Sequence, residues 1–150
     1  MKIGVIYASM SGNTEAIADM IVEQLMEQNH EVDLKDMLSL SSANELLNYD
    51  LVFMGMYTWG DGDYPDECLD IIEEMEQLDL DQKLFALFGS GDTSYPEFCG
   101  ALDKLKDLME GQSGVCLGTP LRIEFNPSKA DEEEINHFVM QALSVFEKSS

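Results

Sequence analysis

Basic residues are scarce in this sequence. Eight Lys and Arg stand against 30 Asp and Glu, and the formal net charge is −22 at pH 7. A surface of that sign repels nucleic acids and anionic membranes. The sequence therefore predicts no nucleic-acid or membrane partner. The excess of acid either keeps the protein dissolved or forms an acidic face that docks on a basic partner.

Cysteines and long hydrophobic runs are also few. The three cysteines, Cys68, Cys99 and Cys116, show no C-x-x-C spacing, which disfavours a disulfide framework and a zinc site. The longest apolar run after the N-terminus, residues 51–57, falls far short of the ~20 residues of a membrane span. The first residues lack the pattern of a signal peptide. A soluble protein in a reducing, cytoplasmic compartment is expected.

Apolar periodicity alternates between the spacing of strands and that of helices. Strands are predicted at residues 3–7, 51–56 and 84–88, with an edge strand near Val32 and Leu34 and a last strand, which can be split, within 115–125. Helices are predicted at residues 13–28, from Pro65, at 98–109 and after a capping box at Ser128, with a short one between the second and third strands. This alternation predicts an α/β domain over residues 1–150 with a parallel sheet covered by helices on both faces.

The loop after the first predicted strand has the composition of an anion cradle. It contains Ser9, Met10, Ser11, Gly12, Asn13 and Thr14 and leads directly into a helix. Backbone N–H groups at a helix N-terminus favour an anion. Neither Gly-Lys-Ser/Thr nor G-x-G-x-x-G is present, and no Lys or Arg lies in the loop. The pattern indicates a phosphate monoester held by neutral hydrogen bonds, with an ordinary helix cap as the alternative.

Two further loops follow the third and fourth strands, where an open sheet of this kind binds its ligand. The first contains Thr58, Trp59, Gly60, Asp61 and Gly62, and it places the only Trp of the chain in a glycine-rich turn, where its ring can stack on a planar ligand. The second contains Gly89, Ser90, Gly91, Asp92, Ser94, Tyr95, Glu97, Phe98 and Cys99. Its glycines allow close approach of the backbone, and Tyr95 offers a second aromatic plane. A core Trp and an ordinary long loop are the alternatives.

With these three loops the sequence closely resembles the flavodoxins over essentially its whole length. The motifs are Ser-Met-Ser-Gly-Asn-Thr, Thr-Trp-Gly-Asp-Gly and Gly-Ser-Gly-Asp-Thr-Ser-Tyr-Pro-Glu-Phe-Cys-Gly-Ala, each after the expected strand. Residues 115–125 leave no room for an insertion of ~20 residues, so the short-chain type is expected. The resemblance implies a flavodoxin-like, five-stranded parallel sheet of order 2-1-3-4-5 and non-covalently bound FMN.

The resemblance also implies a role for each loop. Residues 9–14 would bind the phosphate, and Thr58 and Ser94 would lie near the phosphate or the ribityl chain. The isoalloxazine ring would lie between Trp59 and Tyr95. Backbone groups around Asp92, Glu97 and Cys99 would meet the pyrimidine edge of the ring.

The expected function is that of a low-potential, one-electron carrier with no substrate of its own and no catalytic residue. After the first electron, the Gly60 carbonyl could accept a hydrogen bond from flavin N5 if the following peptide flips, which glycine permits. Acids near the loops oppose further negative charge; at ~10 Å and an effective dielectric of ~40, each contributes ~0.8 kcal/mol, or ~35 mV. These acids are Asp61, Asp63, Asp66, Glu67, Asp92 and Glu97.

Expected partners have basic docking faces: a flavodoxin or ferredoxin reductase as donor, and a cytochrome P450, a desaturase or a similar acceptor. A monomer is expected. Three alternatives carry less weight. The intact Trp and Tyr loops disfavour a flavodoxin-like activator of ribonucleotide reductase. Ser9 and Ser11 stand where a phosphoacceptor domain would need paired acids, and no inserted segment offers the lid or interface of an FMN-dependent quinone reductase.

Overall fold

The computed structural model describes residues 2–9, 12–58, 63–91 and 99–149. In these parts the chain forms an open sheet whose strand pairs are all parallel. Its strands are β1 (Ile3–Ala8), β2 (Val32–Asp36), β3 (Leu51–Met56), β4 (Leu84–Gly91), β5 (Val115–Cys116) and β6 (Leu121–Glu124). The strand order is β2-β1-β3-β4-β5, and β6 also pairs with β4. The predicted α/β fold class and the order 2-1-3-4-5 are confirmed.

The last position of the sheet is occupied by two short strands. β5 pairs with the beginning of β4, at Leu84 and Phe85, whereas β6 pairs with its end, from Phe88 to Gly91. The final strand, for which the sequence left one strand or two open, is therefore split.

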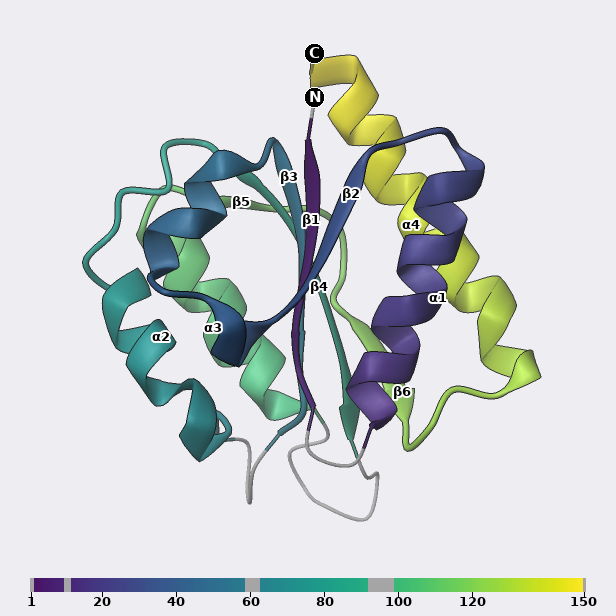
Figure 1. Ribbon diagram of the computed structural model, residues 1–150, viewed down its shortest axis with the longest axis horizontal. Coiled ribbons are helices and arrows are strands. Elements are labelled where there is room, and N and C mark those ends of the chain that lie inside the picture. The colour runs from purple at the N-terminus through teal and green to yellow at the C-terminus, as the bar shows by residue number, and fades with distance from the viewer. Residues whose placement is uncertain (1, 10–11, 59–62, 92–98, 150) are drawn as a thin grey trace.

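Helices cover both faces of the sheet (Figure 1). They are α1 (Asn13–Glu27), α2 (Leu69–Met75), α3 (Gly100–Gly111) and α4 (Lys129–Ser149). Figure 1 shows α1 and α4 on one face, and α2 and α3 on the other. Three short 3₁₀ segments accompany them: η1 (Met37–Ser39), η2 (Ala43–Asn48) and η3 (Asp66–Cys68). The short helix expected between the second and third strands is thus a pair of 3₁₀ turns, and the helix expected from Pro65 begins as one.

Local sequence explains where the long helices lie. Ile17, Ile21 and Leu25 recur every four residues in α1, and all three are fully buried against the sheet. Before α4, the Ser128 N–H donates to Asp131 Oδ2 at 2.8 Å, and the Ser128 hydroxyl donates to the same oxygen at 3.1 Å. An acid that accepts from the backbone N–H three residues earlier is one half of a capping box, which the sequence predicted here.

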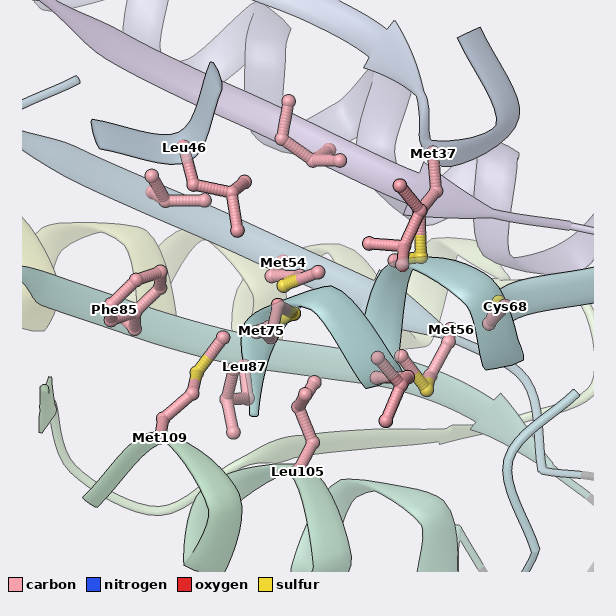
Figure 2. Packing of buried hydrophobic residues seen from close by; sticks show 14 of the residues in the cluster. Met37, Leu46, Met54, Met56, Cys68, Met75, Phe85, Leu87, Leu105 and Met109 are labelled. Carbon is pink, nitrogen blue, oxygen red and sulfur yellow. The ribbon is translucent and has the colours of Figure 1, made fainter. Parts of the chain in front are cut away.

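Two hydrophobic clusters lie on opposite faces of the sheet. Between the sheet and α2 and α3, the buried set includes Met37, Met54, Met56, Met75 and Met109, all with no exposed surface. Figure 2 shows this cluster, with its sulfur atoms in yellow. The cluster beneath α1 and α4 contains Ile3, Val5, Phe53, Phe88 and Phe138 among its buried members.

The carboxyl ends of three strands meet at one edge of the sheet. The register pairs Ala8 with Met56 and Gly55 with Phe88, so β1, β3 and β4 end close together. After β1 the chain adds β2 on one side and β3 on the other, which makes this edge the switch point of the sheet. Across the described ranges, no helix is both long and apolar enough to cross a membrane.

Candidate functional site

The described part of the turn between β1 and α1 consists of Ser9 and Gly12, the residue before the helix. Gly12 has φ of 91°, in the left-handed region that favours glycine, and its carbonyl accepts from the Ala16 N–H at 3.0 Å. The Gly12 N–H donates to Ser9 Oγ, also at 3.0 Å. That bond leaves the Ser9 hydroxyl proton for another acceptor. The first N–H groups of α1, from Asn13 on, have no partner within the helix and carry the positive end of its dipole.

A buried pair of hydroxyls joins this turn to β4. Thr14 Oγ1 and Ser90 Oγ lie 2.7 Å apart, and the two residues are only 1% and 4% exposed. Thr14 belongs to the first turn of α1, so this hydrogen bond fixes the start of the helix against the sheet. Both residues were predicted to contact the ligand. The structure brings them together and directs their hydroxyls at each other.

Gly89, Ser90 and Gly91 belong to β4, whereas the sequence predicted that the strand ends at Phe88. The reason is the pairing with β6, which extends to Gly91. A Cβ atom at Gly89 would lie 2.4 Å from the Met56 carbonyl oxygen and 3.1 Å from Leu102 Cδ1. Only glycine fits between the end of β3 and α3. The backbone of β4 thereby runs close to the predicted ligand edge.

Thr58 connects the end of β3 to the start of α3. Its Oγ1 accepts from the Ala101 N–H at 3.1 Å. Cys99, the residue before α3, provides no side-chain cap. Thr58 therefore satisfies a helix-start donor from 43 residues away and keeps its own hydroxyl proton for donation.

Cys99 adopts a left-handed conformation, with φ of 55°, and is buried. Burial raises the pKa of its thiol to about 11. A thiol that stays protonated is a poor nucleophile, which agrees with a packing role for this side chain. Its backbone carbonyl accepts from Arg122 Nη1 at 3.4 Å.

Many of the predicted site residues lie outside the described residues. They are Met10, Ser11, Trp59, Gly60, Asp61, Gly62, Asp92, Ser94, Tyr95, Glu97 and Phe98. The described members are Ser9, Gly12, Asn13, Thr14, Thr58, Gly89, Ser90, Gly91 and Cys99. The described members come from the three predicted loops, at or near the ends of β1, β3 and β4.

Other contacts around this edge were not expected from the sequence. The Tyr57 hydroxyl donates to Glu67 Oε1 at 2.8 Å, and burial followed by the hydrogen bond to Glu67 raises the tyrosine pKa. Lys104 Nζ on α3 pairs with Asp63 Oδ1 at 2.8 Å. These contacts join segments 10 and 41 residues apart, and the local pattern holds no signal for them.

The sheet defines a class of protein: a doubly wound α/β protein with its switch point between β1 and β3, where the described residues Ser9 and Gly12 lie at the start of α1. The family model described as flavodoxin matches residues 5–138. The chain belongs to the flavodoxin family, and it is a flavin-based electron carrier. The resemblance noted from the three sequence motifs is confirmed.

Individual relatives agree with this assignment. The chain is 47% identical over 140 residues to probable flavodoxin 2 of Bacillus subtilis (strain 168), covering 93% of each protein. It is similar to the solved structure of oxidised flavodoxin 2 from Bacillus cereus, with a TM-score of 0.92, 40% identity and coverage of 97% of this chain and 99% of that one. Oxidised flavodoxin 1 from Bacillus cereus gives a TM-score of 0.91 at 36% identity, with coverage of 96% and 98%.

Proposed function

We propose that this chain binds FMN non-covalently at the carboxyl edge of its sheet and serves as a low-potential, one-electron carrier. Flavodoxin-like sheets are the known example of FMN bound at the β1/β3 switch point. The observation that carries the proposal is the turn at Gly12, a helix-start cradle with neutral donors. A phosphate monoester fits such a cradle, because N–H groups and hydroxyls can hold it without a cation.

The described residues at this edge are suited to binding FMN. In the described part of the chain, no atom lies within 4 Å of a Cβ built at Gly12, so this side of the turn is open to a ligand. Ser9 and Thr58 each keep a hydroxyl proton to donate. When bound, FMN supplies the isoalloxazine ring that takes up and releases electrons. Trp59 and Tyr95 remain the predicted ring contacts, and the backbone around Cys99 the predicted contact of the pyrimidine edge.

Acids at the edge favour a low potential. Asp63, Asp66 and Glu67 follow β3, and all three are exposed, so solvent and salt reduce the effect of each below the ~35 mV of an unscreened charge at ~10 Å. Asp63 is also paired with Lys104. Because each substitution removes one negative charge, whether or not that charge is paired, we expect both Asp63→Asn and Asp66→Asn to raise the midpoint potential, with both effects shrinking at high salt.

The remaining features of the proposal follow from charge and size. An acidic surface favours redox partners with basic docking faces, such as a flavodoxin or ferredoxin reductase as donor and a cytochrome P450 or desaturase as acceptor. We also propose that the protein forms a single domain over residues 1–150, is a monomer, and is located in the cytoplasm. As a carrier, it would have no substrate of its own.

The first test is binding. Apoprotein is titrated with FMN and with riboflavin, which lacks the phosphate, and flavin fluorescence is recorded. Gly12→Ala strains a residue with φ of 91°, and we expect it to weaken FMN binding about 10-fold or more while leaving riboflavin binding unchanged. If FMN fails to bind the unaltered protein, the proposal is wrong.

The second test is stepwise anaerobic reduction of the FMN-loaded protein, followed by absorption. Two resolved one-electron steps are expected of a carrier. A single two-electron step would favour a quinone-reductase type of flavoprotein instead.

A further inference from the structure

The start of α3 is held by contacts from two other elements. Cys99 precedes the helix with φ of 55° and ψ of 31°, and it has a Cβ atom that disfavours this conformation. A non-glycine residue remains there only where its surroundings hold it. Thr58 on one side supplies the acceptor for the Ala101 N–H. On the other side lies Arg122 of β6.

Arg122 spans the first turn of α3. Its Nη1 donates to the Cys99 carbonyl oxygen at 3.4 Å and to Asp103 Oδ2 at 3.3 Å, and its Nη2 donates to Asp103 Oδ1. The guanidinium thus forms a fork on one carboxylate and also reaches the carbonyl four residues earlier. Such a planar fork fixes orientation as well as distance.

The strand alternation of β6 directs Arg122 to this place. Leu121 and Ile123 are buried in the cluster beneath α1 and α4, so the side chain between them points to the opposite face, where α3 lies. Arg122 pairs in register with Gly89, the glycine that lets β4 pass close to β3 and α3. It is the only arginine in the chain.

We propose that Arg122, with Asp103, is a positioning residue for flavin binding: it holds the left-handed Cys99 turn, whose backbone is a predicted contact of the flavin ring. This inference rests on the proposed function. Arg122→Gln removes one positive charge and with it the ion pair to Asp103, so the charge-retaining Arg122→Lys is needed to separate the geometry of the fork from net charge near the flavin.

The test compares two flavins and three variants. Apoprotein is titrated with FMN and with riboflavin, and the dissociation constants are measured by fluorescence. Loss of hydrogen bonds to a charged group predicts that Arg122→Gln weakens both flavins by a similar factor, about 10- to 100-fold. Arg122→Lys retains the charge without the fork, and we expect it to restore only part of the affinity.

Lys2→Gln is the matched control. Lys2 pairs with Asp33 at 3.2 Å at the opposite edge of the sheet, and its substitution removes one cation and one ion pair there. We expect both flavins to bind this variant as they bind the unaltered protein. A fall in affinity equal to that of Arg122→Gln would show that the effect is one of net charge, and it would overturn the proposal.

Other results for the Arg122 variants would also contradict the proposal. Unchanged riboflavin affinity in Arg122→Gln, or full affinity in Arg122→Lys, contradicts a positioning role for the fork. If Arg122→Gln does not fold, as judged by urea unfolding of the apoprotein, Asp103→Asn takes its place and is expected to weaken both flavins by a smaller factor; no change would overturn the proposal. Failure of the unaltered protein to bind either flavin would instead refute the proposed function.

Discussion

The core beneath α2 and α3 is rich in sulfur, whereas the core beneath α1 and α4 is built from branched and aromatic side chains. Five fully buried methionines and the buried thiols of Cys68 and Cys99 lie in the first. Among the described residues, the second has only Met20, and that one is partly exposed. Methionine is unbranched and fills irregular gaps, and the α2/α3 face is the one that carries the 3₁₀ segments.

The described residues predicted to contact the two ends of a ligand lie beside different faces of the sheet. The Gly12 turn leads into α1, whose buried stripe packs against β-branched and aromatic residues. Thr58 and Cys99 contact or precede α3, on the methionine-rich face. Gly12 therefore precedes a helix on the face built from branched and aromatic side chains, whereas Thr58 and Cys99 lie beside the more adaptable, methionine-rich face.

The largest expected effect is on the face built from branched and aromatic side chains. Phe53 is fully buried and meets Phe138 edge to face, with ring centroids 5.8 Å apart. Phe53→Ala removes this contact and leaves a cavity, which we expect to lower the free energy of unfolding by about 3–5 kcal/mol. The midpoint of urea unfolding of the apoprotein measures the loss, and a change below about 1 kcal/mol would contradict a rigid core on this side.

A smaller loss is expected from overpacking the same face. A Cβ atom at Gly55 would lie 2.2 Å from Cε2 of the buried Phe88 ring, so Gly55→Ala should cost about 1–3 kcal/mol of unfolding free energy. Gly111→Ala is the control, because within the described chain no atom lies near a Cβ at that helix position. It should leave stability unchanged or raise it slightly. Equal effects of the two variants in urea unfolding would refute the steric argument.

Alkaline pH should weaken the sulfur-rich face. Burial raises the pKa of the Cys68 thiol to about 12 and that of Cys99 to about 11, from 9.0. The folded state keeps both protons where the unfolded chain releases them. The contribution of these two protonated thiols to the free energy of unfolding is therefore complete below pH 9. It is lost as pH rises towards 11–12, by on the order of 1 kcal/mol per pH unit for each thiol.

Urea midpoints at pH 8 and pH 10 measure this fall. Cys68→Ala is the control, because its own pH dependence should be shallower whatever its stability at pH 8. Tyr7, on the other face, begins to contribute only above its ordinary pKa of 10, since its pKa is raised to about 12 by burial and then by Glu15. The same slope in Cys68→Ala as in the unaltered protein would rule out the thiol as the cause.

The smallest effect should come from Met54→Leu. Met54 follows Phe53 in β3 and is equally buried, but it faces the methionine-rich cluster. A swap of similar volume in an adaptable core should cost less than about 1.5 kcal/mol. A loss in urea unfolding as large as that of Phe53→Ala would remove the distinction between the two faces.

Local patterns predicted the strands and helices because each buried stripe is visible in the sequence. Residues 51–56 were predicted as a strand and form β3, and the helix predicted at 13–28 differs from α1 by one residue at its end. The end of β4 was missed because Gly89, Ser90 and Gly91 have the composition of a loop. Only the pairing with β6 makes them strand, and that pairing lies more than 30 residues away.

The candidate site was predictable as composition but not as contact. The sequence indicates hydroxyls and glycines at the ends of three strands, and the structure places the described ones at one edge. The sequence gives no sign that Thr14 and Ser90 form a hydrogen bond with each other, or that Thr58 caps α3, because these contacts join residues 76 and 43 positions apart. Arg122 offered one signal that could have been used, an isolated cation between two apolar strand residues.

The connection between β5 and β6 is a suitable site for inserting additional sequence. Each half is registered independently on β4, so neither depends on the length of the connection between them. At that connection Gly118 and Thr119 are exposed, and Gly118 has φ of 63° with open space around it among the described residues. Lengthening an exposed loop costs little conformational entropy. A peptide tag or a small folded module could be inserted here, giving an electron carrier tethered to an enzyme through the middle of its sequence.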